Sequence, residues 1–306
     1  MELTIFSGTA NRPLGEALAW ALGSPLGDCK LERFPDGELH VELGEDVRGR
    51  NVCIIQPTAP PVGENLLELL LMADACWRAG AARIMAVLPY FGYARQDRRA
   101  SPSEALGGKL VADLLVRGHF DRLMAVNLHT ASLEGCFTVP LEHLNAGTLL
   151  AEAARPYAGP GAVVVSPDLG AVKLAERYAR QLELPLAIVH KSRTSGSEVN
   201  VRGLVGEVRG LRPIIVDDLI STAGTIAATA EAVLEAGSAD DITVVATHAL
   251  LVGPAVERLS KVPIRRLLST DSVVPPKGLP FQHEVVSLAP LLADAICRVT
   301  AHVRPR

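Results

Sequence analysis

The sequence of 306 residues has few aromatic side chains, 4% of the total, and five cysteines without a Cys-x-x-Cys pair. Any core must therefore be built from aliphatic residues. Scattered cysteines of odd number favour neither a disulfide framework nor a cysteine zinc site, and they indicate a reducing, cytoplasmic location. No apolar run reaches the roughly 18 residues that a membrane span needs. The first residues, Met1 to Thr4, lack the basic start of a secretory signal.

The sequence also lacks an excess of positive charge. It has 30 basic and 34 acidic residues, which gives a net charge of −4. We therefore expect neither a nucleic-acid nor a membrane partner, and an anionic ligand must be met by local basic groups. Hydrophobic residues make up 48% of the chain, enough for one large or two medium domains.

Short apolar runs alternate with longer amphipathic segments along most of the chain. Predicted strands lie at 52–56, 84–88, 122–126, 162–165, 186–189, 213–216 and 242–246. Predicted helices lie at 64–79, 102–116, 170–181 and 223–235. Strands that are apolar on both faces and alternate with helices indicate an α/β fold with mainly parallel sheets flanked by helices.

Local signals predict one helix start and one domain boundary. Ser101, Pro102 and Glu104 supply an N-cap, a proline at the first helical position and a capping-box acid. Polar and Pro/Gly-bearing stretches at 142–161 separate two halves of similar rhythm. We expect an N-terminal domain at 1–145 and a C-terminal domain at 146–306.

The predicted strand at 213–216 is followed by two acids, Asp217 and Asp218, and then by a turn of small residues that opens a helix. That turn consists of Ser221, Thr222, Ala223, Gly224 and Thr225. Small side chains let backbone N–H groups and the helix dipole approach an anion, while adjacent carboxylates suit ribose hydroxyls or Mg2+. The pattern predicts a sugar-phosphate site; the alternative is an acid pair followed by ordinary Ser/Thr capping.

Two further motifs carry possible nucleotide chemistry. Arg33-Phe34-Pro35-Asp36-Gly37-Glu38 is a turn with an aromatic ring and two acids. Arg95, Gln96 and Asp97 follow the predicted strand at 84–88 within Tyr-Ala-Arg-Gln-Asp-Arg. An aromatic ring stacks on a base, and guanidinium groups clamp phosphates. Each motif alone is equally consistent with an ordinary turn or a solvated charge run.

These motifs together resemble the ribose-phosphate diphosphokinase (PRPP synthetase) family. The loop at 217–225 is similar to the phosphoribosyl diphosphate loop that this family shares with type I phosphoribosyltransferases. The segments Arg-Phe-Pro-Asp-Gly-Glu and Tyr-Ala-Arg-Gln-Asp-Arg resemble the family's ATP-site segments, which transferases lack. The resemblance runs from residue 7 to residue 293 and implies two phosphoribosyltransferase-like domains, with a C-terminal helix at 289–304 able to pack on the first.

The resemblance also implies roles for individual residues. ATP contacts fall on Phe34, Asp36, Gly37, Glu38, Arg95, Gln96 and Asp97, and magnesium positions on His129 and Asp168. Catalytic residues on a flexible loop are Lys191 and Arg193. Ribose 5-phosphate falls to Arg193, Asp217, Asp218, Ser221, Thr222, Ala223, Gly224 and Thr225.

The chain departs from the common family pattern near the implied metal site. Asn127 and Thr130 stand in a stretch that usually reads Asp-Leu-His-Ala, and Thr138 and Glu142 replace two later acids. Ser221 stands where the phosphate loop commonly has Asp. A neutral amide binds Mg2+ less strongly than a carboxylate, so these departures predict weaker metal binding.

The implied activity is transfer of the β,γ-diphosphate of Mg-ATP to the anomeric hydroxyl of ribose 5-phosphate, giving PRPP and AMP. The implied cofactor is Mg2+, the implied partners are ATP and ribose 5-phosphate, and the implied assembly is a dimer-based homo-oligomer such as a hexamer. Two alternatives stay open from the sequence. One is a non-catalytic regulatory homologue, which the metal-region departures favour. The other is a type I phosphoribosyltransferase, which rests on the loop at 217–225 alone.

Overall fold

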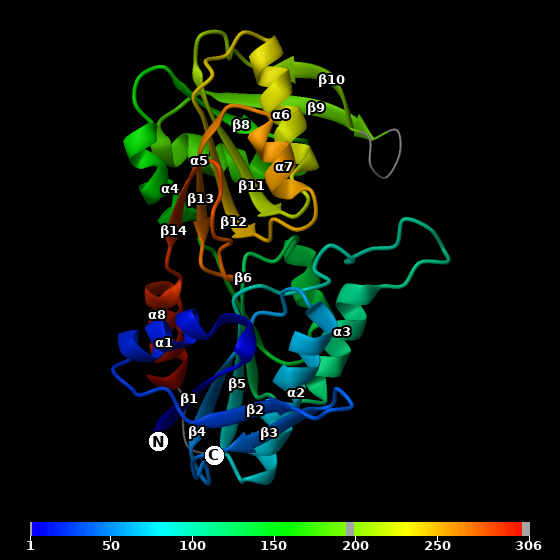
Figure 1. Ribbon diagram of the computed structural model, residues 1–306, viewed down its shortest axis with the longest axis vertical. Coiled ribbons are helices and arrows are strands. Elements are labelled where there is room, and N and C mark those ends of the chain that lie inside the picture. Colours follow the sequence, from blue (N-terminus) through cyan, green and yellow to red (C-terminus); the bar gives the residue numbers. More distant parts are fainter. Residues whose placement is uncertain (1, 194–198, 302–306) are drawn as a thin grey trace. The chain divides into compact units, whose positions relative to one another are not determined.

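A computed structural model describes the backbone of residues 2–193 and 199–301, and side chains at 2–190 and 203–300. The chain divides into two compact units (Figure 1). Unit 1 comprises Met1–Asn145, Ser272–Val274 and Ser287–Arg306, and unit 2 comprises Ala146–Asp271 and Pro275–Val286. Each unit is built around its own β-sheet.

Unit 1 has a five-stranded parallel sheet in the order β1-β4-β5-β6-β7. Its strands are β1 (Leu3–Ser7), β4 (Asn51–Ile55), β5 (Arg83–Leu88), β6 (Arg122–Val126) and β7 (Leu141–Leu144). A separate antiparallel hairpin joins β2 (Cys29–Arg33) and β3 (Leu39–Leu43). The helices are α1 (Arg12–Ala21), α2 (Val62–Arg78), α3 (Gly107–Val116) and α8 (Ala289–Ala301), with short helices η1 (Thr9–Asn11) and η2 (Ala131–Cys136).

Unit 2 has a seven-stranded sheet in the order β10-β9-β8-β11-β12-β13-β14, antiparallel only between β9 and β10. The strands are β8 (Ala162–Ser166), β9 (Leu186–Arg193), β10 (Val199–Val205), β11 (Arg212–Ile220), β12 (Ile242–Ala249), β13 (Ile264–Thr270) and β14 (Gln282–Val286). The helices are α4 (Gly147–Ala154), α5 (Val172–Leu182), α6 (Gly224–Glu235) and α7 (Ala255–Ser260), with the short η3 (Arg155–Tyr157).

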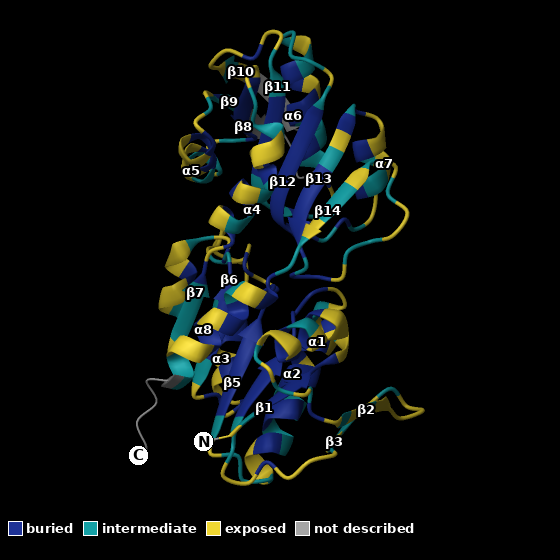
Figure 2. Ribbon diagram, turned by 90° about the vertical axis from the view of Figure 1, so that its left-hand side faces the viewer, coloured by how far each residue is buried: buried dark blue, intermediate teal, exposed yellow. Residues whose placement is uncertain are grey.

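Burial explains why the central strands read as continuous apolar runs. Ile214 and Val216 pack in one cluster with residues of α4 and α5, whereas Ile215 packs in a second cluster with residues of α6 and α7. Alternate side chains of one strand thus enter two cores. Figure 2 shows the same pattern: central strands are buried, and exposed residues lie mainly on helices and loops. The predicted fold class is confirmed.

The predicted helix start at Ser101 to Glu104 is wrong, because α3 begins at Gly107. The Glu104 carboxylate does accept a hydrogen bond, from the Ala100 N–H at 2.7 Å. That bond closes a local turn. The helix begins later, at Gly107 and Gly108, where the absence of side chains allows close packing against neighbouring residues. A capping-box pattern therefore marked a turn that precedes the helix.

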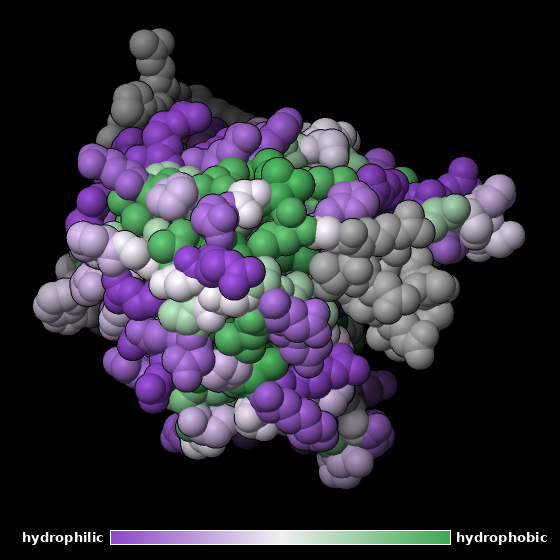
Figure 3. Space-filling model, turned by 90° about the horizontal axis from the view of Figure 1, so that it is seen from above, coloured by the Kyte–Doolittle hydropathy of each residue, from purple (hydrophilic) through white to green (hydrophobic). Residues whose placement is uncertain are grey.

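No helix among the described residues combines the length and the apolar character needed to cross a bilayer. Apolar side chains nevertheless reach the surface (Figure 3). In unit 2 the exposed large ones include Leu169, Val205 and Val285. Single exposed apolar residues of this kind are ordinary on folded proteins.

Candidate functional site

The hairpin β2–β3 presents the first predicted motif at its tip. Phe34 directly follows β2, and 47% of its surface is exposed. The backbone closes the turn with bonds from Phe34 N to Glu38 O at 2.8 Å and from Gly37 N to Phe34 O at 2.9 Å. Gly37 has a φ of 97°, which glycine adopts without strain. Phe34, Asp36 and Glu38 are thus exposed together at the tip of the hairpin.

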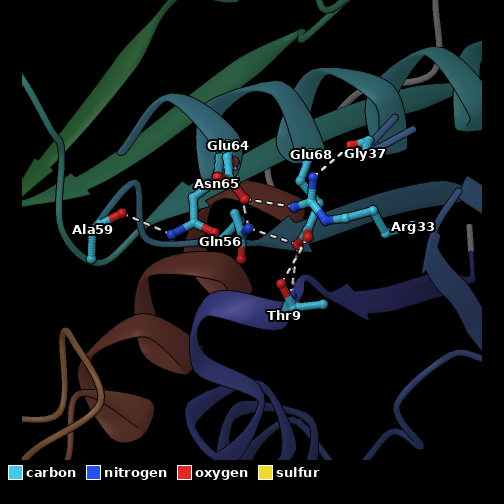
Figure 4. Close-up of polar contacts among 8 residues, drawn as sticks. All are labelled: Thr9, Arg33, Gly37, Gln56, Ala59, Glu64, Asn65 and Glu68. Carbon is cyan, nitrogen blue, oxygen red and sulfur yellow. Dashed lines mark hydrogen bonds and ion pairs between the residues drawn. The ribbon is translucent and has the colours of Figure 1, made fainter. Parts of the chain in front are cut away.

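Arg33, the last residue of β2, fixes this tip to the sheet domain. Its guanidinium donates two hydrogen bonds, one to the Gly37 carbonyl and one to the Glu64 carboxylate on α2, and each is 2.6 Å long. Figure 4 shows Arg33 reaching across to the helix that carries Glu64. The guanidinium joins the turn to a helix of the main body, so it limits the orientations of the tip.

A buried polar cluster lies beside this contact (Figure 4). The Glu68 carboxylate, 4% exposed, accepts bonds from Thr9 N at 2.6 Å, Thr9 Oγ1 at 2.7 Å and Gln56 Nε2 at 2.7 Å. A Cβ atom at Gly8 would lie 2.3 Å from Gln56 Oε1. Position 8 therefore requires glycine, because a larger residue would collide with the side chain of Gln56. The hydrogen bonds of the cluster stabilise the turn between β1 and α1.

The second motif forms the loop after β5. Arg95 and Gln96 are exposed, and Asp97 is partly buried. A Cβ atom at Gly107 would lie 2.3 Å from Gln96 Oε1, and Gly108 N donates to Gln96 O at 3.0 Å. The start of α3 thus packs directly on the loop. Two glycines there give Gln96 its position.

Asp97 connects this loop to the predicted metal position. Thr130 Oγ1 donates to Asp97 Oδ2 at 2.7 Å, and Thr130 directly follows His129. His129 lies just beyond the carboxyl end of β6 and is exposed. Parallel α/β sheets bind ligands at this edge. The structure therefore brings Gln96, Asp97 and His129 to one region of unit 1.

The hairpin tip makes no polar contact with the loop after β5 among the residues that the structure describes. Within residues 2–190, no hydrogen bond, ion pair or ring contact joins Phe34, Asp36 or Glu38 to the segment from Arg95 to Asp97. The two motifs predicted to bind ATP are thus separate elements of unit 1. Each is held by its own partners, the tip by Arg33 and the loop by Gly107 and Thr130.

In unit 2, Asp217 and Asp218 lie within β11, because the strand runs on to Ile220 instead of ending at Val216 as expected. Leu219 and Ile220 still pair with β12. Asp168 follows the adjacent parallel strand β8, and its Oδ1 accepts from Gly170 N at 2.9 Å and Ala171 N at 3.1 Å. Three acids thus meet at the carboxyl ends of neighbouring strands.

These acids are close enough to influence one another electrostatically. The pKa of the Asp217 carboxyl lies well above its ordinary value, first because of burial and then because of repulsion by Asp218 and Asp168. Carboxylates that repel one another in a partly buried site are stabilised by a bound cation or by hydroxyl donors. These acids therefore suit hydroxyl donors such as the diol of a ribose.

The small-residue turn lies where the sequence predicts it. Ser221 to Ala223 join β11 to α6, which begins at Gly224. Ala223 adopts a left-handed conformation with a φ of 58°, which is unfavourable for a side chain with a Cβ atom. Strained backbone at the start of a helix is typical of ligand-binding turns. The turn presents N–H groups at the helix N-terminus, the arrangement that binds phosphate.

Sequence reasoning missed a cation beside this turn. Arg258 on α7 donates from Nη1 to the Thr222 carbonyl at 3.0 Å, and that atom lies 3.3 Å from where a Cβ of Gly224 would be. The residue is 36 positions away in sequence, within no recognisable motif. Only the packing of α7 against α6 brings it to the turn.

The structure says less about the predicted catalytic residues and the predicted magnesium positions. Lys191 and Arg193 end β9, and their side chains lie outside the described residues. Among the side chains that the structure does describe, no group of three or more His, Cys, Asp or Glu lies close enough to hold a metal ion. Of the two predicted magnesium positions, His129 belongs to unit 1 and Asp168 to unit 2.

Comparison with known proteins covers both units. Residues 3–117 match the N-terminal domain of ribose phosphate pyrophosphokinase, and residues 140–280 match a phosphoribosyl transferase domain. A ribose-phosphate pyrophosphokinase from Caldanaerobacter subterraneus is 44% identical over 97% of this chain and 95% of its own length. One from Rhodopirellula baltica is 46% identical with the same coverage.

A solved structure extends the similarity to three dimensions. The phosphoribosylpyrophosphate synthetase from Mycobacterium smegmatis superimposes with a TM-score of 0.91 at 37% sequence identity. The match covers 99% of this chain and 100% of that one. Similarity thus extends over both units and over all the motifs described above.

Proposed function

The chain belongs to the ribose-phosphate pyrophosphokinase family, and we propose that it transfers the β,γ-diphosphate of Mg-ATP to the anomeric hydroxyl of ribose 5-phosphate. The products are PRPP and AMP. The observation that carries the proposal is similarity to named pyrophosphokinases at 44–46% identity over 97% of the chain. The presence of both ATP-site motifs favours this enzyme over a phosphoribosyltransferase.

We assign ATP to unit 1. Phe34 stacks on the base, and Asp36 and Glu38 accept hydrogen bonds at the exposed tip that Gly37 closes. Arg95 binds phosphate oxygens, and Gln96 and Asp97 provide polar contacts beside it. The packing of Gln96 against Gly107 and the bond from Thr130 to Asp97 support this assignment, because they hold the loop in one conformation.

We assign ribose 5-phosphate to unit 2. The turn from Ser221 to Thr225 binds the 5-phosphate through backbone N–H groups and hydroxyls at the start of α6. Asp217 and Asp218 accept bonds from the ribose hydroxyls. The raised pKa of Asp217 supports this assignment, because hydroxyl donors relieve the repulsion among its acidic neighbours.

Members of this family generally need a metal ion, and we propose that this ion is Mg2+. The proposed magnesium positions are His129 in unit 1 and Asp168 in unit 2. Mg2+ is usually bound through one or two carboxylates together with substrate phosphates, and it neutralises charge on the transferred group. Burial, Asp218 and Asp168 raise the pKa of the Asp217 carboxyl, and a cation bound near these acids would relieve their repulsion.

We propose Lys191 and Arg193 as the catalytic residues, with Arg193 also contacting ribose 5-phosphate. Diphosphate transfer needs no protein nucleophile, since catalysis comes from positioning and from stabilising charge on oxygens in the transition state. Two cations at the end of β9 meet that need. We further propose domains at 1–145 and 146–306, with the C-terminal helix at 289–304 packed on the first domain. We also propose a dimer-based homo-oligomer and a cytoplasmic location.

The test is an assay with purified protein, Mg-ATP and ribose 5-phosphate. Formation of AMP and PRPP in equal amounts is expected. Absence of both with intact nucleotide binding would favour a regulatory homologue, and consumption of PRPP in the presence of a nucleobase would favour a transferase. A size measurement of the same sample tests the oligomer.

A further inference from the structure

A polar relay outside the motifs ends on the backbone next to His129. His143 on β7 accepts a hydrogen bond at Nε2 from the Leu128 N–H over 2.9 Å. Its Nδ1 lies 2.5 Å from Glu134 Oε1, on the short helix η2. His143 keeps 21% of its side-chain surface exposed and Glu134 46%. The relay thus joins three successive segments of unit 1.

The geometry fixes the tautomer of His143. A backbone N–H can only donate, so Nε2 must carry a lone pair. The ring proton then sits on Nδ1 and is donated to the Glu134 carboxylate. The Leu128 N–H and the Glu134 carboxylate thus favour the same tautomer, and the carboxylate accepts the Nδ1 proton. Glu134 therefore stabilises the tautomer in which His143 accepts from Leu128.

The residue held by this relay lies beside the proposed metal position. Leu128 precedes His129 and is buried in the core of unit 1, whereas His129 is exposed. On the other side, Thr130 is bound to Asp97 of the ATP loop. The neighbouring strand residue Glu142 is engaged with Arg122 at 2.5 Å. The His129 backbone is thus held on one side by His143 and on the other by Asp97.

We propose that Glu134 and His143 form a positioning pair, which presents His129 to the metal–ATP complex by fixing the backbone of Leu128. The inference rests on the proposed function for the identity of that ligand, and it assigns roles to two residues outside the motifs. Neither residue contacts substrate in this assignment. Their effect passes through one hydrogen bond to a buried residue.

The experiment compares two substitutions at Glu134. Glu134→Gln keeps an oxygen that accepts from Nδ1–H, and Glu134→Leu removes it. The Glu134 side chain is 46% exposed, so both variants are expected to fold. Histidine 15N shifts report the tautomer, with His143→Phe to identify the signal. Calorimetry reports the affinities for Mg-ATP and for ribose 5-phosphate without turnover.

The expected result is a proton on Nδ1 in the parent protein and in Glu134→Gln, and on Nε2 in Glu134→Leu. Affinity for Mg-ATP falls about fivefold in Glu134→Leu and His143→Phe, the equivalent of one hydrogen bond. Affinity for ribose 5-phosphate stays unchanged. A merely structural pair would lower the melting temperature and leave both affinities as they were.

Two results overturn the inference: an Nε2 proton in the parent protein, or unchanged Mg-ATP affinity in both apolar variants. Failure of the proposed function is a separate result, because it appears as absence of AMP and PRPP in a protein that still binds Mg-ATP. A parent protein without affinity for Mg-ATP overturns both.

Discussion

Thr130 Oγ1 lies 2.7 Å from Asp97 Oδ2 and joins the loop after β5 to the loop after β6. The two residues are 33 positions apart. The Thr130 hydroxyl therefore supplies a hydrogen bond that an alanine at this position would lack, and it restrains Asp97 within the proposed ATP site.

Replacing Thr130 with valine should raise the apparent Michaelis constant for ATP by about tenfold, since hydrogen bonds to charged groups contribute about 1.5–3 kcal/mol. Valine keeps the branched shape and removes only the hydroxyl. Thr130→Ser keeps the hydroxyl and is the control. Initial rates at varied ATP give the measurement. Equal constants for the parent, valine and serine forms would show that Asp97 is positioned by other contacts.

The close packing of Gly107 on Gln96 predicts a second effect on ATP. In Gly107→Ala the added methyl group would lie 2.3 Å from Gln96 Oε1, so the side chain must move. We expect an increase of several-fold in the Michaelis constant for ATP with little change for ribose 5-phosphate. The measurement is steady-state kinetics with each substrate varied in turn.

Gly63 on α2 provides the matched control, because a methyl group there has no atom within 4 Å. Both glycines lie in the first turn of a helix. Gly63→Ala should leave both Michaelis constants unchanged and raise stability by up to about 1 kcal/mol, the usual gain in helices. An equal kinetic effect of the two substitutions would contradict the role of Gly107.

The fold was predictable from sequence where packing imposes a simple pattern. After one polar residue at the start, strands β4, β5 and β6 are apolar because both faces are buried, and their predicted positions hold to within one residue. The hairpin β2–β3 escaped prediction, since residues such as Lys30 and Glu32 are exposed and give it no apolar run. The side chains of Cys29, Leu31, Val41 and Leu43 do pack against the core, but they alternate with polar residues over five-residue strands, a pattern too short to be recognised in the sequence.

The residues of the candidate site likewise fall into those that the sequence predicted and those that it did not. Contiguous motifs indicated Asp217 and the turn at 221–225, because residues that bind one phosphate lie close together along the chain. Arg258, Glu134 and His143 gave no signal. Each reaches the site from another element by packing, and a single basic, acidic or imidazole side chain is common on any surface.

Arg258 predicts a selective effect on the sugar substrate. Arg258→Met keeps much of the aliphatic stem and removes the donor to the Thr222 carbonyl. We expect the Michaelis constant for ribose 5-phosphate to rise roughly tenfold, in line with loss of one charged hydrogen bond, with the constant for ATP unchanged. Lys261→Met is the control, because that exposed lysine pairs with Glu257 instead. A similar rise of this Michaelis constant in both variants would show that the effect comes from the loss of positive charge in general and not from the Arg258 contact.

Lys191 tests the proposed catalytic step. Removal of one transition-state contact typically lowers turnover on the order of 100- to 1,000-fold. We expect Lys191→Ala to show a loss of this size with nearly unchanged affinity for ATP, measured by single-turnover kinetics and by calorimetry. A variant that keeps parental turnover would exclude Lys191 from the mechanism.

Asp217 predicts a pH-dependent gain of stability on neutralisation. Its pKa is raised in the folded protein by burial and by Asp218 and Asp168, whereas an aspartate in an unfolded chain has a pKa of about 3.9. Folding therefore favours the protonated form. The cost of the ionised form is absent below the unfolded pKa and grows as the pH rises toward the folded pKa.

Asp217→Asn should thus raise the melting temperature of the ligand-free, metal-free protein at pH 8, by about 2–4 °C for each kcal/mol of repulsion removed. The gain should shrink toward zero near pH 4. Asp240→Asn, at an exposed acid, should change little at either pH. The same Asp217→Asn substitution should weaken ribose 5-phosphate binding, because strained acidic sites are kept for function at a cost in stability. An equal gain at pH 4 and pH 8 would show that ionisation of Asp217 is not its source.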